Sequence, residues 1–121
     1  MMSATTEKPT ISWEEFSRRR DEGMALVTKH PEFAKWKPTS YRALRTRDGA
    51  AWTCNLRYNG KPAGDASNGG YGGPDDIRIT KEDARASFET LKRVLREYDA
   101  EAFKYEIDGS IMDAILTAAG K

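Results

Sequence analysis

Apolar residues repeat at helical spacing near the start of the chain, which predicts a helix over residues 13–28. The positions that fall on one side of it are Trp13, Phe16, Arg20, Met24 and Val27. The run 12–15, Ser-Trp-Glu-Glu, matches a capping box, in which the serine hydroxyl accepts from a free backbone N–H and the second glutamate reaches back. Gly23 weakens the helix by about 1 kcal/mol relative to alanine and favours a break. His30 should end the helix, because a residue before proline avoids the α region.

A longer amphipathic helix is predicted in the second half of the chain. Its apolar positions alternate at spacings of four and three and form a stripe that can pack on a sheet. These positions are Ala84, Phe88, Leu91, Leu95, Tyr98 and Ala102. The run 80–83, Thr-Lys-Glu-Asp, resembles a second capping box, with Asp in place of Glu or Gln. The run 108–110, Asp-Gly-Ser, predicts a turn and N-cap before a short final helix over 111–119.

The centre of the chain has the alternation of a half-buried strand. Apolar residues occupy every second position of residues 51–58, and a preceding strand is expected over 41–47. Asn59-Gly60 predicts a hairpin turn into a return strand over 61–67. Pro62 has no N–H for a ladder, which indicates that this return strand lies at an edge. Residues 77–79 fit either a short strand or the lead-in to a helix.

This order of elements predicts an α+β fold. We expect a three-stranded antiparallel meander packed by the long helix, with an N-terminal helix and a short C-terminal helix. Residues 31–39 are expected to form an irregular connector whose aromatic side chains fill the core. Residues 1–10 read as a flexible tail, and 11–121 as a single domain. An exposed edge near Lys61 leaves pairing into a dimer open.

The charge is nearly balanced but unevenly distributed. The 121 residues include 20 basic and 19 acidic side chains, for a net charge of +1. Residues 1–62 hold 12 Lys or Arg against 7 Asp or Glu, whereas residues 63–121 hold 8 against 12. The acidic half suits a basic partner surface. No apolar run reaches the length of a membrane span and the N-terminus lacks a signal peptide, so we expect a cytoplasmic protein without membrane contact.

The residues that carry most enzyme chemistry are scarce. Cys54 is the single cysteine and His30 the single histidine, which excludes an internal disulfide and a cysteine-based zinc site. Cys54 lies in the apolar alternation of a strand and is expected to be buried and inert. His30 is expected to cap a helix end. We therefore predict no catalytic residues, no metal site and no cofactor.

A glycine-rich stretch over residues 68–76 is the unusual part of the chain. Five of the ten glycines lie between Gly64 and Gly73. Such a stretch fits a turn with positive φ, a backbone cradle for an anion, or a recognition loop with Tyr71 at its tip. The spacing matches neither a phosphate-binding loop nor a dinucleotide fingerprint, and Asp75 and Asp76 oppose phosphate by charge. A cation held by Asp65, Asn68, Asp75 and Asp76 lacks a recognised spacing.

A basic platform offers an alternative interface for single-stranded nucleic acid. It needs cationic side chains beside an aromatic ring on which a base can stack. The residues that could supply it are Arg42, Arg45, Arg47, Arg57 and Tyr58.

The stretch 58–74 resembles a pattern of small phage and prophage proteins. In that pattern a strand, an Asn/Asp-Gly-Lys turn and a second strand lead into Asn-Asp-Gly-His-Gly-Gly. Here Gly69 stands at the aspartate position and Tyr71 at the histidine position, so no role of that pair carries over. The resemblance covers about residues 52–76. It implies a phage context, hence the host-cell cytoplasm, in which small proteins often bind and block a host factor.

The leading hypothesis is thus a non-enzymatic protein that binds a host protein or protein complex and acts by occlusion, such as an inhibitor of a CRISPR effector. The residues expected to contact the partner are Asn68, Gly69, Gly70, Tyr71, Gly72, Gly73, Asp75, Asp76 and Arg57. The alternatives are a nucleotide or anion binder that uses the glycine-rich loop, and a small module that binds single-stranded nucleic acid.

Overall fold

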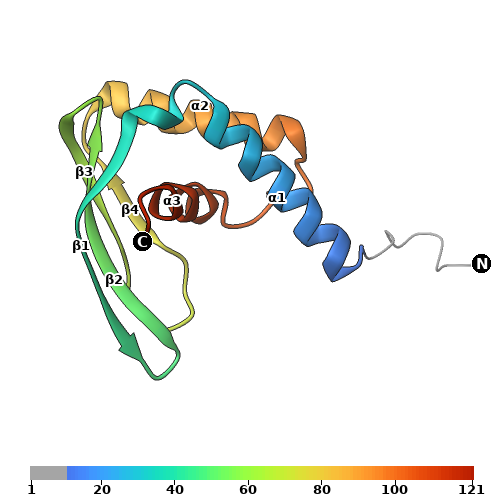
Figure 1. Ribbon diagram of the computed structural model, residues 1–121, viewed down its shortest axis with the longest axis horizontal. Coiled ribbons are helices and arrows are strands. Elements are labelled where there is room, and N and C mark those ends of the chain that lie inside the picture. Colours follow the sequence, from blue (N-terminus) through green and yellow to red (C-terminus); the bar gives the residue numbers. More distant parts are fainter. Residues whose placement is uncertain (1–10) are drawn as a thin grey trace, which may run out of the picture.

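The computed structural model describes residues 11–121, so the tail expected over residues 1–10 lies outside the described residues. The described chain folds into an antiparallel sheet and three α-helices, with a one-turn 3₁₀ helix between α1 and the first strand (Figure 1). The elements in order are α1 (Trp13–Lys29), η2 (Phe33–Lys35), β1 (Trp36–Thr46), β2 (Gly49–Tyr58), β3 (Lys61–Asn68), β4 (Asp76–Ile79), α2 (Glu82–Tyr98) and α3 (Ile107–Ala118). The α+β class is confirmed.

The sheet has four strands in the order β1-β2-β3-β4, not three as expected. The added strand, β4, pairs with Gly64 to Ser67 of β3. β3 is therefore an interior strand, and the expectation that it forms an edge is wrong. Pro62 is tolerated because it lies beyond the end of the pairing with β4, where no ladder bond to that side is needed. The edges are β1 and β4.

The turn between β2 and β3 forms where Asn59-Gly60 predicts it, with φ of +56° and +82°. β1 begins at Trp36, five positions earlier than expected, so the connector after α1 is shorter. A bulge separates Thr39 from Arg42 in the pairing with β2, and Ser40 adopts a φ of +54° there. The bulge leaves Tyr41 on the side of Trp52, with which its ring stacks.

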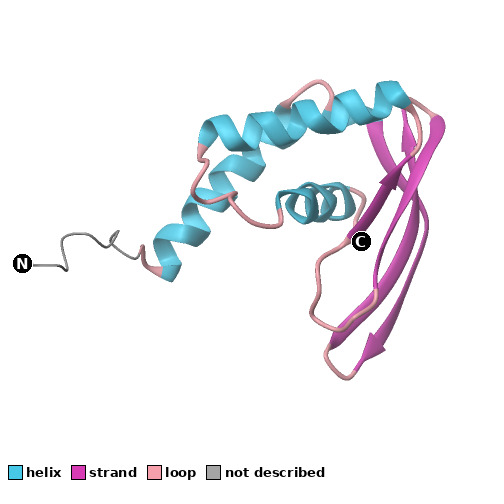
Figure 2. Ribbon diagram, turned by 180° about the vertical axis from the view of Figure 1, so that it is seen from behind, coloured by secondary structure: helices cyan, strands magenta, loops and turns pink. Residues whose placement is uncertain are grey.

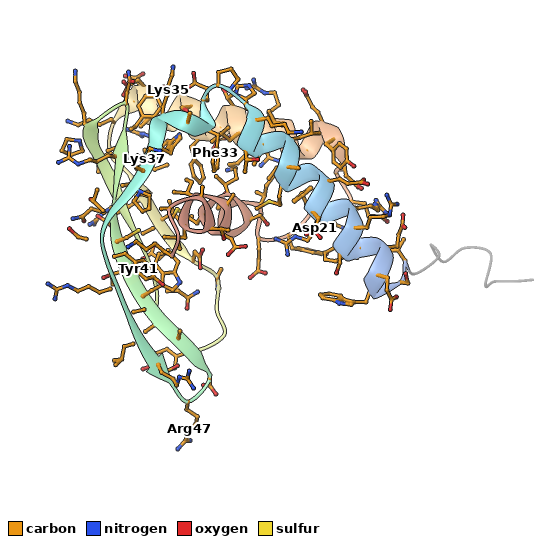
Figure 3. The ribbon with its side chains drawn as sticks, in the orientation of Figure 1. Asp21, Phe33, Lys35, Lys37, Tyr41 and Arg47 are labelled. Atoms are coloured by element: carbon orange, nitrogen blue, oxygen red, sulfur yellow. The ribbon has the colours of Figure 1, made fainter. Side chains whose placement is uncertain are left out.

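All three α-helices lie on one side of the sheet and leave its other face bare (Figure 2). The sheet and the pair α1–α2 form an angle, and α3 lies inside it (Figure 1). The core fills this angle. Phe33 of η2 points into it (Figure 3). The largest fully buried side chains of the core are Leu56, Leu91, Leu95, Ile111, Met112, Ile115 and Val27. Cys54 is buried among them, as expected.

The helix ends follow the sequence signals only in part. Ser12 caps α1 by accepting from the Glu15 N–H at 3.0 Å, and His30 leaves the helix in an extended conformation. The second capping box does not form, because the Thr80 hydroxyl instead donates to the Ala63 carbonyl of β3. α3 begins four residues earlier than expected, after Glu106 in a left-handed conformation. Residues 108–110 are therefore part of the helix itself, and the separate turn and N-cap predicted there do not form.

No helix within residues 11–121 combines the length and apolar character that crossing a bilayer demands.

Candidate functional site

The glycine-rich segment, residues 68–75, lies between two hollows of the molecule. The first, which we call the helical cleft, has a volume of about 830 Å³ and lies between the first half of α1, the first turn of α3 and residues 73–75. The second, the sheet hollow, has a volume of about 430 Å³ and lies on the bare face over the first half of β2. In Figure 1 the segment runs below α3 toward the lower end of the sheet.

One side chain organises the interior of the glycine-rich segment. The Asn68 Oδ1 atom accepts from the Gly70 N–H at 2.8 Å. Its Nδ2 atom donates to the Gly73 carbonyl at 3.1 Å and to the Asp75 carboxylate at 2.9 Å. The Gly70 N–H is thus already satisfied, and a carbonyl and a carboxylate point toward Asn68. This arrangement opposes an anion inside the loop, because oxygen atoms repel one.

The segment is fixed to the hairpin of β1 and β2 at Gly70. Gly70 is buried with a φ of +80°, and a Cβ atom there would lie 2.8 Å from the Thr46 side chain and 2.9 Å from the Ala51 nitrogen. The Thr46 hydroxyl donates to the Gly70 carbonyl at 2.8 Å. Only glycine fits this close approach. The glycine-rich segment is therefore a loop that is anchored to the hairpin at Gly70.

Tyr71 extends from this anchored loop into solvent. Its side chain is 81% exposed, and a Cβ atom on Gly69 would lie 3.2 Å from its ring. Gly69 in turn lines the sheet hollow. Tyr71 is thus placed beside that hollow. Gly72 and Gly73 are exposed as well.

Asp75 and Asp76 diverge although they are adjacent. Asp76 is exposed at the start of β4, whereas Asp75 turns toward the helical cleft and lies close to Gly109 of α3. Burial raises the pKa of the Asp75 carboxyl, the bond from Asn68 lowers it, and the nearby charges of Asp113 and Glu106 raise it further. The structure therefore separates the expected contact residues of this segment into an outward group around Tyr71 and an inward group of Asn68, Gly70 and Asp75.

Arg57 belongs to a different part of the bare face. It pairs with Lys37 of β1, and its Nη1 atom donates to the Gly60 carbonyl at 2.8 Å. Six positions of β2 separate it from Ala51, beside which Gly70 is anchored, which corresponds to roughly 20 Å at the rise of a strand. The structure does not bring Arg57 and Tyr71 into one small patch.

The residues of the nucleic-acid alternative do not gather on one platform. Arg42 and Arg57 occupy bare-face positions of the sheet, whereas Arg45 pairs with Ala50 and alternates to the other side. Arg47 lies at the far tip of the hairpin (Figure 3). The Tyr58 hydroxyl donates to Glu32 at 2.7 Å, and its ring packs against Trp36 on the helical side. Tyr58 is thus not placed for base stacking beside Arg57.

The bare face is basic and carries one large exposed apolar side chain. Within residues 11–121 no carboxylate pairs with Lys37, Arg42 or Arg57, whereas Arg78 pairs with Asp65 at 2.8 Å. Leu44 is 71% exposed on this face and lines the sheet hollow together with Arg42. Leu44 was not among the predicted contact residues, although its position among arginines in a predicted strand was the available signal.

Two aromatic residues of the helical cleft were also missed. Trp13 was expected on the apolar side of α1, yet it is 73% exposed because the first turn of α1 projects beyond the core. Tyr105, in the connection between α2 and α3, is 75% exposed and lines the same cleft. Neither exposure follows from local spacing.

Within the described residues, no three His, Cys, Asp or Glu side chains are grouped so that they could hold a metal ion. Comparisons of the chain with protein-family models, with curated proteins and with solved structures found no match.

Proposed function

We propose that the protein is a non-enzymatic binding protein that captures a partner protein on the bare face of its sheet. The observation that carries this proposal is the sheet hollow, with exposed Leu44 on one side and Gly69, against which exposed Tyr71 lies, on the other. A hollow bordered by large exposed apolar and aromatic side chains, on a face that no helix covers, is typical of a protein contact surface.

The side chains of the bare face also indicate which chemical groups the partner offers. Tyrosine contributes a large contact area at a low cost in side-chain entropy, and the anchoring at Gly70 lowers that cost further. Within residues 11–121, Arg42, Lys37 and Arg57 form no ion pair with a carboxylate, and they are available to acidic groups of the bound protein. The proposed partner therefore offers an apolar side chain for the hollow and carboxylates around it.

Binding of this kind acts by covering a surface of the partner. The resemblance of residues 58–74 to small phage proteins makes a host factor, such as a CRISPR effector complex, the proposed target. A protein partner is favoured over single-stranded nucleic acid because the aromatic side chains of the strands, Trp36, Tyr41, Trp52 and Tyr58, pack on the helical side.

The test compares capture of proteins from a bacterial lysate by the wild-type chain and by the variants Leu44→Asp and Tyr71→Ala. Both variants should lose the enriched partner, because truncation of a central contact residue often costs 2 kcal/mol or more, about 30-fold in affinity. Leu26→Asp is the matched control, since Leu26 is an exposed apolar residue of α1 that lines neither hollow. Thermal unfolding checks that each variant is folded.

Equal capture by wild type and both variants would contradict the assignment of the surface. Absence of any enriched protein would contradict the function itself. A parallel capture from nuclease-treated lysate separates the two classes of partner, because loss of the signal there shows that nucleic acid carries the interaction.

A further inference from the structure

The helical cleft has walls of a different chemistry from the bare face. The aromatic residues that line it are Trp13, Phe16, Trp52 and Tyr105. The acidic residues that line it are Asp75, Glu101, Glu106, Asp108 and Asp113, against a single cationic residue, Arg20. Its volume of about 830 Å³ lies within the range of clefts that enclose ligands of roughly 300–1,000 Å³.

Part of this negative charge is not neutralised within the described chain. Glu101 pairs with Arg19 at 3.1 Å and Asp108 pairs with Lys92 at 3.0 Å. Glu106 and Asp113 are exposed and form no ion pair within residues 11–121. Arg20 lines the same cleft but forms no ion pair with a carboxylate within the described residues; its Nη2 atom donates to the Ser110 hydroxyl at 2.9 Å.

Aromatic and acidic groups together favour an organic cation. The face of a tryptophan attracts an ammonium or guanidinium group, and neighbouring carboxylates strengthen that attraction. One ring of the cleft already takes part in such a contact, since the Lys104 Nζ atom lies 5.4 Å from the centroid of Tyr105. Trp13 stacks on Phe16 at 5.8 Å through one face, and its side chain otherwise lies in solvent.

We propose that the helical cleft is a second binding site, which takes a lysine- or arginine-bearing segment of a protein against Trp13, Glu106 and Asp113. Charge complementarity selects this occupant: the lining carries five carboxylates, and an anionic ligand would be repelled. The cleft lies on the opposite side of the glycine-rich segment from the sheet hollow. This second site therefore does not depend on the proposed function of the bare face.

The site also connects two elements that are distant in the sequence. Trp13 comes from the first turn of α1, whereas Glu106 immediately precedes α3 and Asp113 lies in the middle of α3. Asp75 reaches the same cleft from the glycine-rich segment and lies against Gly109 of α3. A bound cationic side chain would reduce the repulsion among these carboxylates, which is a favourable contribution to binding.

The test uses a fluorescein-labelled hexa-arginine peptide, a hexa-glutamate peptide and spermidine as probes. The fluorescence anisotropy of hexa-arginine should rise on titration with the protein, and its binding should weaken as salt increases. Bound hexa-arginine should also shift the Trp13 indole N–H signal in NMR spectra. Hexa-glutamate should not bind. Trp13→Ala, and separately Glu106→Gln combined with Asp113→Asn, should each weaken hexa-arginine binding at least about 5-fold.

The matched control is Glu82→Gln combined with Glu97→Gln. It changes the net charge by the same amount on exposed positions of α2 that do not line the cleft. Equal weakening by this control would overturn the proposal, because binding would then follow net charge alone. Unchanged binding by Trp13→Ala would overturn it too, as would binding of spermidine at Trp13 without binding of the peptide. Thermal unfolding establishes that each variant is folded.

Discussion

Gly23 shows how a single residue can be selected by a neighbour that is distant in the sequence. It lies in the middle of α1, where its low helix propensity favours a break, yet the helix is continuous. A Cβ atom at this position would lie 2.5 Å from the ring of Phe103. Phe103, from the connection between α2 and α3, is buried and cannot easily move. Glycine is present here because it permits close packing, and the lost helix propensity is the cost.

We therefore expect Gly23→Ala to destabilise the protein, although alanine is the better helix former. Overpacking a buried contact costs about 1–3 kcal/mol, which exceeds the gain of about 1 kcal/mol in propensity. Urea unfolding measures the difference. Gly73→Ala is the control, since a Cβ atom there has no neighbour within 4 Å. In a double-mutant cycle, Phe103→Leu should cost less in the Gly23→Ala background than alone. A more stable Gly23→Ala variant would disprove the packing argument.

At the scale of elements, Glu32 joins the one-turn helix η2 to the sheet. Its carboxylate accepts from the Lys35 Nζ atom at 2.8 Å and from the Tyr58 hydroxyl of β2 at 2.7 Å. The bonds from Lys35, Tyr58 and Ser87 lower the pKa of Glu32 to about 2. Ser87 also accepts from the buried Trp36 indole N–H at 3.0 Å, which connects α2 to the start of β1. Together, these hydrogen bonds of Glu32 and Ser87 fix the point at which the chain passes from α1 into the sheet.

The lowered pKa sets the direction of a pH dependence. The ionised form of Glu32 is favoured in the folded protein, so its contribution is fully present above about pH 4.5 and is lost as the pH falls toward 2. Glu32→Gln should lower the free energy of unfolding by about 1 kcal/mol at pH 7. This difference from wild type should shrink between pH 4.5 and 2 in urea titrations. Tyr58→Phe should show a smaller effect of the same sign. A difference independent of pH would contradict the assignment.

At the scale of the whole molecule, the protein consists of a sheet and the helix pair α1–α2, which meet around α3. The N-terminal half of α1 is held to the end of α2 by Arg19, which pairs with Asp99 and with Glu101. Farther along α1, the Tyr98 hydroxyl donates to Glu22. The bond from Arg19 lowers the pKa of Asp99. The position of α1, and with it one wall of the helical cleft, therefore depends on a few charged contacts.

We expect Asp99→Asn to loosen α1 without unfolding the sheet. Loss of the charge weakens the pair with Arg19, so local opening of α1 and of residues 99–106 becomes easier. Hydrogen–deuterium exchange should increase severalfold in α1 and in this connection and stay unchanged in β2 and β3. Glu15→Gln is the control, because in the described part of the chain Glu15 pairs only with Arg18, on the exposed side of α1. Equal loss of protection in the sheet would contradict this account.

Strong local signals predicted most of the elements but not their exact limits. The Ser12 cap and the Asn59-Gly60 turn formed as expected, since each depends on a few adjacent residues. β4 could not be distinguished from a helix lead-in, because four residues are too few to show a period. Its pairing depends on Gly64, where a Cβ atom would lie 1.9 Å from the Arg78 carbonyl. The early start of α3 depends on the left-handed Glu106, for which the sequence carries no clear signal.

The sequence by itself determined the α+β class, the central hairpin, the capped first helix and the buried Cys54, because periodicity and turn chemistry act over short distances. It also identified Tyr71 as a candidate contact residue, which the structure places in solvent. Only the tertiary structure decided that one face of the sheet is bare, that Asn68 and Asp75 turn inward, and that Trp13 lies beside α3 in an acidic cleft. These features depend on which face the helices cover and on contacts between residues far apart in the chain, which no local pattern records.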